Sequence, residues 1–260
     1  MGQVTRAHVL LEAMFWWPVW SLRYSIRDFD RLEARMFDIL ARGLAARPGD
    51  WDPQALADPA WRTSGEGGDP TESFLRSATV MINQRGYRGA SVNRIAAALG
   101  VTKGSFYHHH EAKDDLVFEC FENSYDRLSA VQIAAGRAAG DGWRQIASAL
   151  AELIDLQFRD PTPLLRTAAL QALPMGDRGS VVTRSNRLAN RFAGMISDGI
   201  ADGSVRAVDP MVASQLIMPA LNGAYEARAW AGRQPDERTA VRHYAWTLAA
   251  GVFSDPPELG

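Results

Sequence analysis

The residues from Ser91 to Leu116, SVNRIAAALGVTKGSFYHHHEAKDDL, decide the fold of this chain. Two short helical patterns meet there across Gly100. In the first pattern Ile95, Ala96 and Leu99 share one helical face, and glycine is a residue on which helices commonly end. A short amphipathic helix is therefore predicted to stop at the glycine.

The second pattern follows Val101, whose side chain is expected to return to the core. Thr102 can cap a short helix in which Phe106 points inward. The other residues of this helix stay free to face a partner: Lys103, Gly104, Ser105, Tyr107 and His108. Together the two patterns predict a helix-turn-helix.

A third helix is predicted immediately before this pair. Asp69 offers an N-cap, Pro70 stands at the first helical position and Glu72 completes a capping box. Apolar residues follow at helical spacing until Gly86, and Ser91 is placed to cap the next helix. Those apolar residues are Phe74, Ala78, Met81 and Ile82. Three helices are therefore expected between residues 71 and 110.

The run from Glu72 to Leu116 resembles the DNA-binding region of the TetR family of one-component transcriptional regulators. The signature positions are Ile95-Ala96, Leu99-Gly100-Val101, Lys103-Gly104-Ser105-Phe106-Tyr107 and Lys113. The chain departs from the family at His110, where phenylalanine is usual, and at Ala112, where a serine-like cap is usual. A histidine there is compatible with the edge of the core or with a phosphate contact, so its role is left open.

Charge supports a local rather than a general affinity for nucleic acid. The formal net charge is −2 and the sequence pI is about 6.2, which argues against a protein that coats polyanions. Between residues 71 and 110 the sequence has five basic residues and one acidic residue, Glu72, which gives this stretch a local charge of plus four. The five are Arg76, Arg85, Arg88, Arg94 and Lys103.

The resemblance implies roles for the second helix of the pair and its neighbours. Thr102, Lys103, Ser105 and Tyr107 would face the major groove, His108 the DNA backbone, and Gly104 would allow close approach. Lys113 would contact phosphate and Arg94 is included among the DNA contacts. The alternatives are solvated surface charges for the two lysines, which are the only lysines of the chain, and core packing for Tyr107.

The three consecutive histidines do not predict a metal site. Neighbouring residues on a helix project about 100° apart and cannot converge on one ion. No metal and no cofactor are expected. The sequence also has no glycine-rich phosphate loop, metal-ligand spacing or nucleophile motif, so we do not expect an enzyme.

The remainder of the chain predicts an all-α fold. One helical stripe runs from Trp143 to Phe158 and ends at residues 160–163, and a further helix is expected over Leu164 to Leu173. Another stripe runs from Leu188 to Ile200. The last two long helices are expected at about Pro210 to Ala231 and Pro235 to Phe253.

The resemblance gives this helical region two uses. The last two helices would pair with their copies in a homodimer, and the internal helices would enclose a small apolar effector. The candidate lining residues, for which ordinary core packing is the alternative, are Trp143, Phe158, Met175, Phe192, Met195, Met218 and Tyr225.

The first sixty-odd residues lie outside the minimal family plan and hold five of the eight tryptophans. The apolar run Val9 to Trp20 is too short to span a membrane, and a cytoplasmic protein is expected. Phe29 to Leu44 aligns with Glu237 to Val252, sharing a late leucine and glycine. We hypothesise that residues 4–46 are a duplicated end of the regulatory domain; the alternative is two unrelated amphipathic helices.

The sequence thus predicts three parts. Residues 1–68 form a helical extension and a linker that begins at Arg47, residues 69–116 form the DNA-binding domain, and residues 117–255 form the effector-binding and dimerisation domain. Cys120 stands alone, so a buried structural thiol is expected rather than a disulfide, with a redox switch as the alternative.

The predicted function is that of a dimeric repressor on a near-palindromic operator in double-stranded DNA. Its two recognition helices would fit major grooves about 34 to 36 Å apart, and the effector would favour a dimer with a different spacing. The alternative is a ligand- or protein-binding helical module whose helix-turn-helix no longer binds DNA specifically.

Overall fold

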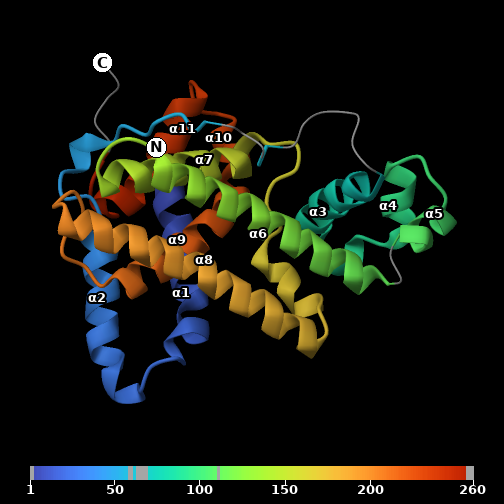
Figure 1. The fold of residues 1–260 in the computed structure, drawn as a ribbon, viewed down its shortest axis with the longest axis horizontal. Coiled ribbons are helices and arrows are strands. Elements are labelled where there is room, and N and C mark those ends of the chain that lie inside the picture. The colour runs from blue at the N-terminus through green and yellow to red at the C-terminus, as the bar shows by residue number, and fades with distance from the viewer. Residues whose placement is uncertain (1–2, 58–60, 63–69, 110–111, 256–260) are drawn as a thin grey trace. The chain divides into compact units, whose positions relative to one another are not determined.

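The computed structural model describes residues 3–57, 61–62, 70–109 and 112–255 of the chain (Figure 1). Within these residues the structure is helical, and its extended pairing is limited to an isolated antiparallel bridge between Ala45 and Val205. The chain forms two compact units. One comprises residues 1–58, 131–158 and 189–260, here called the regulatory unit, and the other comprises residues 59–130 and 159–188, here called the reader unit.

The reader unit begins with the three predicted helices. They are α3 (Pro70–Gly89), α4 (Val92–Ala98) and α5 (Lys103–His109), and the first part of α6 (Lys113–Arg137) follows. Gly86 interrupts α3 with a positive φ of 69°, which confirms the predicted break there. Asp69, the predicted cap of α3, lies outside the described residues.

A small apolar core holds these helices together. Phe74 of α3 and Phe106 of α5 are 2% and 0% exposed, and their rings meet edge to face at 5.9 Å. Ile95, Leu116 and Phe121 are fully buried in the same unit. The inward position predicted for Phe106 is therefore confirmed.

One ion pair is buried in the reader unit. The Arg127 guanidinium lies 3.1 Å from the Asp160 carboxylate and donates to the Thr162 carbonyl at 2.6 Å and to the Trp61 carbonyl. Burial lowers the pKa of Arg127, while Asp160 opposes that shift. The pair thereby ties α6 to the segment that follows Arg159.

Two sequence predictions for this unit were wrong. The expected helix over residues 164–173 is only a 3-10 helix, η3 (Thr167–Ala172), because Arg166 is extended and the Leu164 carbonyl accepts from the Asn83 side chain at 3.0 Å instead of from a following helical turn. Val101 does not return to the core, since its side chain is 39% exposed and only its N–H is tied down, to the Ala96 carbonyl at 3.0 Å.

The regulatory unit contains the N-terminal extension and the end of the chain. Its helices are α1 (Gln3–Ser21), α2 (Phe29–Arg42), α7 (Gly142–Arg159), α9 (Pro210–Gly223), α10 (Arg228–Ala231) and α11 (Glu237–Ala250), with the later part of α8 (Met175–Ala201). The short 3-10 helices η1 (Ile26–Asp28), η2 (Pro48–Asp50) and η4 (Ala224–Ala227) join them. The predicted helix Pro210–Ala231 is thus divided in three.

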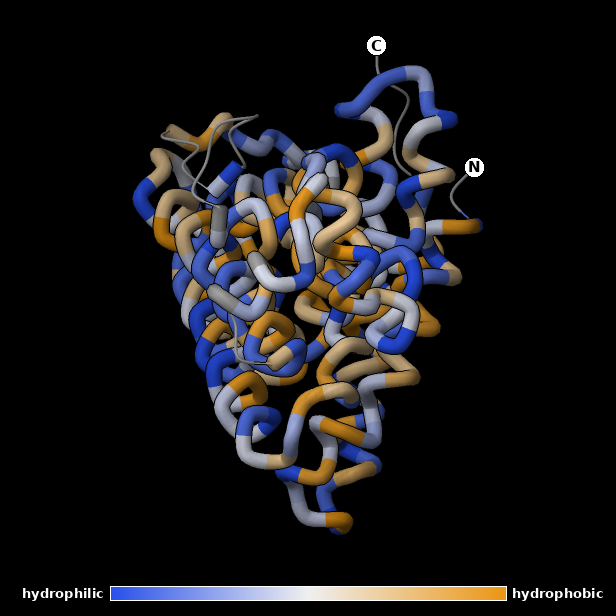
Figure 2. The backbone as a smooth tube through the Cα atoms, turned by 90° about the vertical axis from the view of Figure 1, so that its right-hand side faces the viewer, coloured by the Kyte–Doolittle hydropathy of each residue, from blue (hydrophilic) through white to orange (hydrophobic). Residues whose placement is uncertain are grey.

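The N-terminal helices pack on the C-terminal ones. Both α1 and α2 contact α9 and α11, so the start and the end of the chain share one core. Buried Val9, Ala13 and Trp20 form the inner face of α1. Figure 2 shows hydrophobic residues recurring along the helices between hydrophilic ones, as expected where one side of a helix faces a core.

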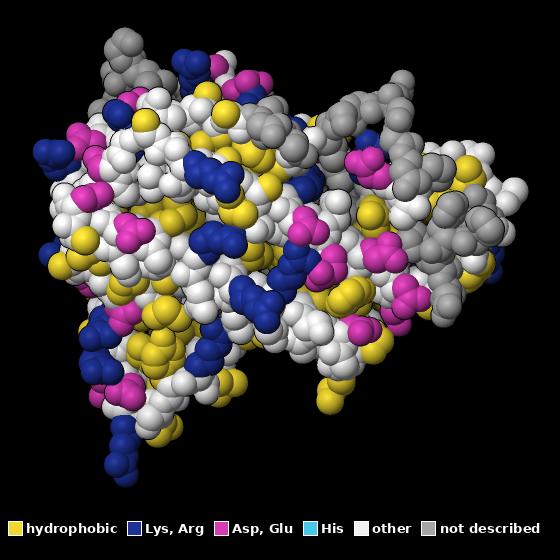
Figure 3. Space-filling model, in the orientation of Figure 1, with side chains coloured by type: hydrophobic (Ala, Val, Ile, Leu, Met, Phe, Trp, Pro, Cys, Tyr) yellow, Lys and Arg dark blue, Asp and Glu magenta, His cyan; other side chains and the backbone are white. Residues whose placement is uncertain are grey.

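The opposite face of α1 is apolar but exposed. Large hydrophobic side chains there and on the following turn are between 41% and 80% exposed: Val4, Leu11, Met14, Phe15, Val19, Leu22 and Ile26. In Figure 3 hydrophobic side chains gather over the α1–α2 hairpin at the lower left. Among the described helices, none is both long and apolar enough to cross a lipid bilayer.

Candidate nucleic-acid interface

The turn between α4 and α5 is built by local hydrogen bonds. The Ser91 hydroxyl accepts from the Arg94 N–H at 3.4 Å, which confirms the predicted cap of α4. Gly100 has a φ of 67°, and the Gly100 N–H donates to the Ala97 carbonyl at 3.1 Å. The glycine thus lets the chain leave α4 and start α5 within a few residues.

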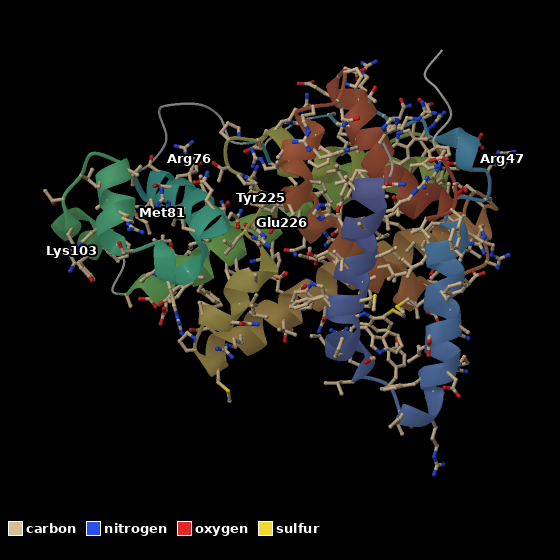
Figure 4. All side chains as sticks on the ribbon, turned by 180° about the vertical axis from the view of Figure 1, so that it is seen from behind. Arg47, Arg76, Met81, Lys103, Tyr225 and Glu226 are labelled. Atoms are coloured by element: carbon tan, nitrogen blue, oxygen red, sulfur yellow. The ribbon has the colours of Figure 1, made fainter. Side chains whose placement is uncertain are left out.

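Helix α5 presents one buried and one exposed side. Phe106 is fully buried, whereas Thr102, Lys103 and Gly104 are exposed and Tyr107 is 49% exposed. The Lys103 ammonium lies 5.5 Å from the centroid of the Tyr107 ring. Figure 4 shows Lys103 pointing outward from α5. Tyr107 is therefore available to a partner rather than packed in the core.

The remaining predicted contacts are only partly described. The backbone of Ser105 and His108 belongs to α5, but their side chains lie outside the described residues, and His110 lies outside them altogether. Arg94 is exposed, and its guanidinium donates to the Gly89 carbonyl at 3.0 Å. Arg85 and Arg88 are also exposed, whereas Arg76 is half-buried, so four of the five basic residues counted in the sequence lie at the surface of the reader unit.

Lys113 has a structural contact that the sequence did not reveal. Its ammonium donates to the Tyr87 carbonyl at the end of α3 and lies 3.6 Å from the Tyr87 ring centroid. Burial lowers the pKa of Lys113, with Asp114 opposing the shift. Burial and a hydrogen bond to Asp114 raise the pKa of Tyr87 to about 12. Lys113 therefore links the start of α6 to the end of α3.

The missing cap at Ala112 is compensated one turn later. The Asp115 carboxylate accepts from the Ala112 N–H at 2.8 Å, which is the half of a capping box that needs no side chain at the cap position. Farther along α6, Cys120 is fully buried, its thiol lies 3.5 Å from the Leu75 carbonyl, and burial raises its pKa to about 12. The expected burial of this thiol is confirmed, and a raised pKa disfavours the reactive thiolate form.

Two stretches of the chain match known protein families. Residues 74–120 match the family described as bacterial regulatory proteins, tetR family, and residues 140–243 match the tetracyclin repressor-like C-terminal domain. The chain belongs to the TetR family. Residues before position 74 lie outside both matches.

Individual TetR-family relatives agree with this assignment. The chain is 28% identical to the HTH-type transcriptional repressor KstR2 of Rhodococcus jostii strain RHA1 over 57% of its length and 73% of that protein. It is 29% identical to the Tn10 TetC protein of Escherichia coli over 32% of its length, but that match spans only 42% of TetC. Of these two relatives, KstR2 is named as a transcriptional repressor.

Solved structures of the TetR family share the fold. KstR2 of Mycobacterium tuberculosis superposes with a TM-score of 0.59 and 18% identity, over 72% of this chain and 97% of that one. AibR, solved with isovaleryl coenzyme A and operator DNA, superposes with a TM-score of 0.58 and 21% identity, over 70% of this chain and 100% of that one.

The predicted effector-lining residues occupy different surroundings. Trp143, Phe158, Phe192 and Met195 are buried in the regulatory unit, and Met218 and Tyr225 are half-buried there. Met175 is 85% exposed and belongs to the reader unit, so it does not share the apolar interior of the others.

An aromatic cluster marks the interior of the regulatory unit. The Phe158 ring lies 5.6 Å from Tyr244 and 6.4 Å from Trp230. The Tyr244 hydroxyl donates to the Ala220 carbonyl at 2.7 Å, near the end of α9. Tyr244 and Trp230 were not predicted as interior residues of this cluster, because helical periodicity does not show which other helix a side chain will contact.

A groove that the sequence did not predict lies along α2. It has a volume of about 750 Å³ and runs between α2 and the segment that leads into α9. Its basic side chains already have acidic partners, because Arg35 pairs with Asp209 and Arg42 pairs with Asp38. Its lining residues are Arg31, Ala34, Arg35, Asp38, Ile39, Arg42, Ile200, Ala207, Val208, Asp209 and Pro210.

Proposed function

We propose that this chain is a transcriptional repressor that reads operator DNA with α5 and is released from DNA by a small-molecule effector. The observation that carries the proposal is α5 itself. Its inner side is fixed by fully buried Phe106, and its outer side offers Lys103, Gly104 and Tyr107 to a partner. A short, firmly seated helix with a free polar face fits the major groove of DNA.

The contacts divide into two kinds. Thr102, Ser105 and Tyr107 are proposed to read base edges, and Lys103, Arg94 and His108 to hold the phosphate backbone. Each lost phosphate contact should lower the slope of log affinity against log salt by about 0.9, whereas a lost base contact should cost about 1–3 kcal/mol of sequence discrimination.

The effector is proposed to bind in the apolar interior of the regulatory unit, beside Phe158. AibR was solved with both an acyl-coenzyme A and operator DNA, and KstR2 is named a repressor, so acyl-coenzyme A thioesters are the first class to test. Titration of isovaleryl coenzyme A into the protein–DNA complex should release the DNA. A Phe158→Leu variant should require more of the thioester and bind DNA unchanged.

The first experiment is selection of binding sites from a random duplex library at near-physiological salt, followed by anisotropy against a scrambled duplex. Enrichment of one sequence is expected. Recovery of no preferred sequence, with only weak and salt-sensitive binding, would favour the alternative of a helical binding module that no longer reads DNA.

Lysine substitutions separate reading from folding. Lys103→Ala should flatten the salt dependence of binding and leave the melting temperature unchanged, because Lys103 is exposed. Lys113→Ala should weaken binding to every duplex and also lower the melting temperature, since it removes the tie to the Tyr87 carbonyl. Arg27→Ala, in the regulatory unit, is the control and should alter neither property.

The resemblance also implies a homodimer formed through the last two helices. In this structure α9 and α11 are covered by the N-terminal helices of the same chain. Reading of operator DNA by α5 is proposed for each chain by itself.

A further inference from the structure

Two equivalent main-chain hydrogen bonds join the ends of α2 and α11, one donated by each segment. The Leu44 N–H donates to the Leu248 carbonyl at 2.9 Å, and the Val252 N–H donates to the Leu40 carbonyl at 2.8 Å. Leu44 follows Leu40 by four residues, and Val252 follows Leu248 by four. Exchanging the two segments turns one bond into the other, which is the property of a two-fold related contact.

The two helix-ending glycines show the same reciprocity. Gly43 has a φ of 70° and Gly251 a φ of 84°. A Cβ on Gly43 would lie 2.3 Å from the Ala249 carbonyl oxygen, and a Cβ on Gly251 would lie 2.3 Å from the Ala41 carbonyl oxygen. Each glycine thus leaves room for a carbonyl of the opposite segment. That carbonyl belongs to the residue two positions before the other glycine.

The preceding helices complete the pattern. α1 packs on α9, α1 also packs on α11, and α2 packs on α9, so each hairpin contacts both helices of the other. A proline stands near the C-terminal end of each first helix, Pro18 in α1 and Pro219 in α9. Such reciprocal packing is what the duplication hypothesis predicts, and the duplication itself stays a hypothesis.

The two C-terminal helices have little surface left for another protein. In α11 every residue from Tyr244 to Ala250 is buried, and in α9 every residue from Val212 to Ile217 is buried. Runs of this length pass all the way around a helix, because one turn takes 3.6 residues. Within a single chain these segments of α9 and α11 are already enclosed.

We propose that α1 and α2 act as a built-in second subunit. They occupy, within the same chain, the surface of α9 and α11 to which another copy would otherwise bind. The chain is consequently a monomer. Resting on the proposed function, the inference adds that one chain with one α5 binds a single half-site rather than a palindrome.

The segment after α2 fastens the hairpin to its own chain. The Gln54 N–H donates to the Ser148 hydroxyl at 2.8 Å, the Arg144 guanidinium lies 2.6 Å from the Asp52 carboxylate, and the Trp51 and Trp143 rings are 6.2 Å apart. These contacts to α7 hold residues 51–54 beside the regulatory unit, which disfavours an exchange of hairpins between chains.

The exposed apolar face of α1 is the competing surface for a second copy. Sedimentation velocity of the full chain, over a wide range of concentrations, measures its mass directly. The expected result is one species of 28.5 kDa. A species of twice that mass at working concentrations, formed through the α1 face or any other, would overturn the proposal.

A disulfide tests whether the hairpin is held in cis. Ala45 and Val205 form an antiparallel bridge in which the flanking residues make the hydrogen bonds, an arrangement that places Cα atoms about 4.5 Å apart. The double variant Ala45→Cys/Val205→Cys should therefore oxidise to a disulfide-linked monomer on a non-reducing gel. A disulfide-linked dimer would show exchange between chains and refute the proposal. Ala45→Cys alone is the control.

Binding stoichiometry tests the DNA part of the inference. Titration of the selected duplex, followed by sedimentation of the complex, should give one chain per duplex, and the enriched sequence should lack two-fold symmetry. Two chains on a palindrome would contradict the inference and leave the proposed function standing. Absence of specific DNA binding would defeat the proposed function, while the mass of the free chain would still decide whether it is monomeric.

Discussion

Helices α2 and α11 end in the same way but lie in different surroundings. Both stop at a glycine with positive φ and exchange main-chain bonds with each other. Yet α11 is buried on every side over residues 244–250, whereas α2 buries Leu32 and Ile39 and leaves Phe37 63% exposed. The two helices therefore share the same main-chain contacts at their ends. Their side chains differ because α11 is covered on every side and α2 is not.

The largest expected effect comes from the two glycines. Gly43→Ala or Gly251→Ala should each lower the free energy of unfolding by about 3 kcal/mol or more, because the new Cβ combines an unfavourable φ with overlap on a main-chain carbonyl. Chemical denaturation measures both values.

Gly203→Ala is the matched control for backbone strain. Its φ is 80°, but a Cβ there would meet no atom within 4 Å, so only about 1 kcal/mol is expected. If all three glycine variants cost the same, the ends of α2 and α11 do not approach each other as closely in solution as the structure shows.

The next effect tests whether the inner face of α1 carries the packing. Trp20 is 2% exposed, and Trp20→Ala should lower the free energy of unfolding by about 3–5 kcal/mol. Thermal and denaturant unfolding of the full chain check this value. A cost below about 1 kcal/mol would mean that the hairpin is only loosely attached to α9 and α11.

A smaller effect is expected on how the stability of the protein depends on pH, and it arises in α11. His243 of α11 is half-buried, and burial, with Arg242 adding to it and Asp236 opposing it, lowers its pKa below 6.5. The unfolded chain therefore binds a proton first, so stability is present above pH 6.5 and declines as the pH falls through the lower folded value. His243→Gln should reduce that decline in a series of unfolding measurements. An unchanged slope would place the responsible group elsewhere.

The smallest effect is expected on the outer face of α1. Phe15 is 65% exposed, and Phe15→Ser should change the free energy of unfolding by no more than about 0.5 kcal/mol. A large loss of stability, measured at several protein concentrations, would reveal that this face is covered in solution.

The reader could be predicted from the sequence because its signals are local. The cap at Ser91, the turn at Gly100 and the inward Phe106 each depend on residues a few positions away, and all three are observed. The tie between Lys113 and the Tyr87 carbonyl could not be predicted, because it depends on how α6 meets α3.

The regulatory helices were predicted less accurately. Apolar periodicity located α7 and the end of α8, but it ran on through Ala224, where α9 gives way to a 3-10 helix. Met175 looked like a pocket residue and is exposed, since an apolar side chain in a sequence does not state which unit it joins. The alignment of Gly43 with Gly251 indicated similarity between the two segments, but only their main-chain contacts show that they pair.

The main-chain bonds that join the ends of α2 and α11 can form only late in synthesis. A ribosome makes the N-terminal hairpin first, and about two hundred residues must follow before its partner emerges. At roughly 5–20 residues per second, that delay is about 10–40 s. Throughout it, both apolar faces of α1 are uncovered in the nascent chain, so α1 is the segment of this protein on which a ribosome-associated chaperone would act first.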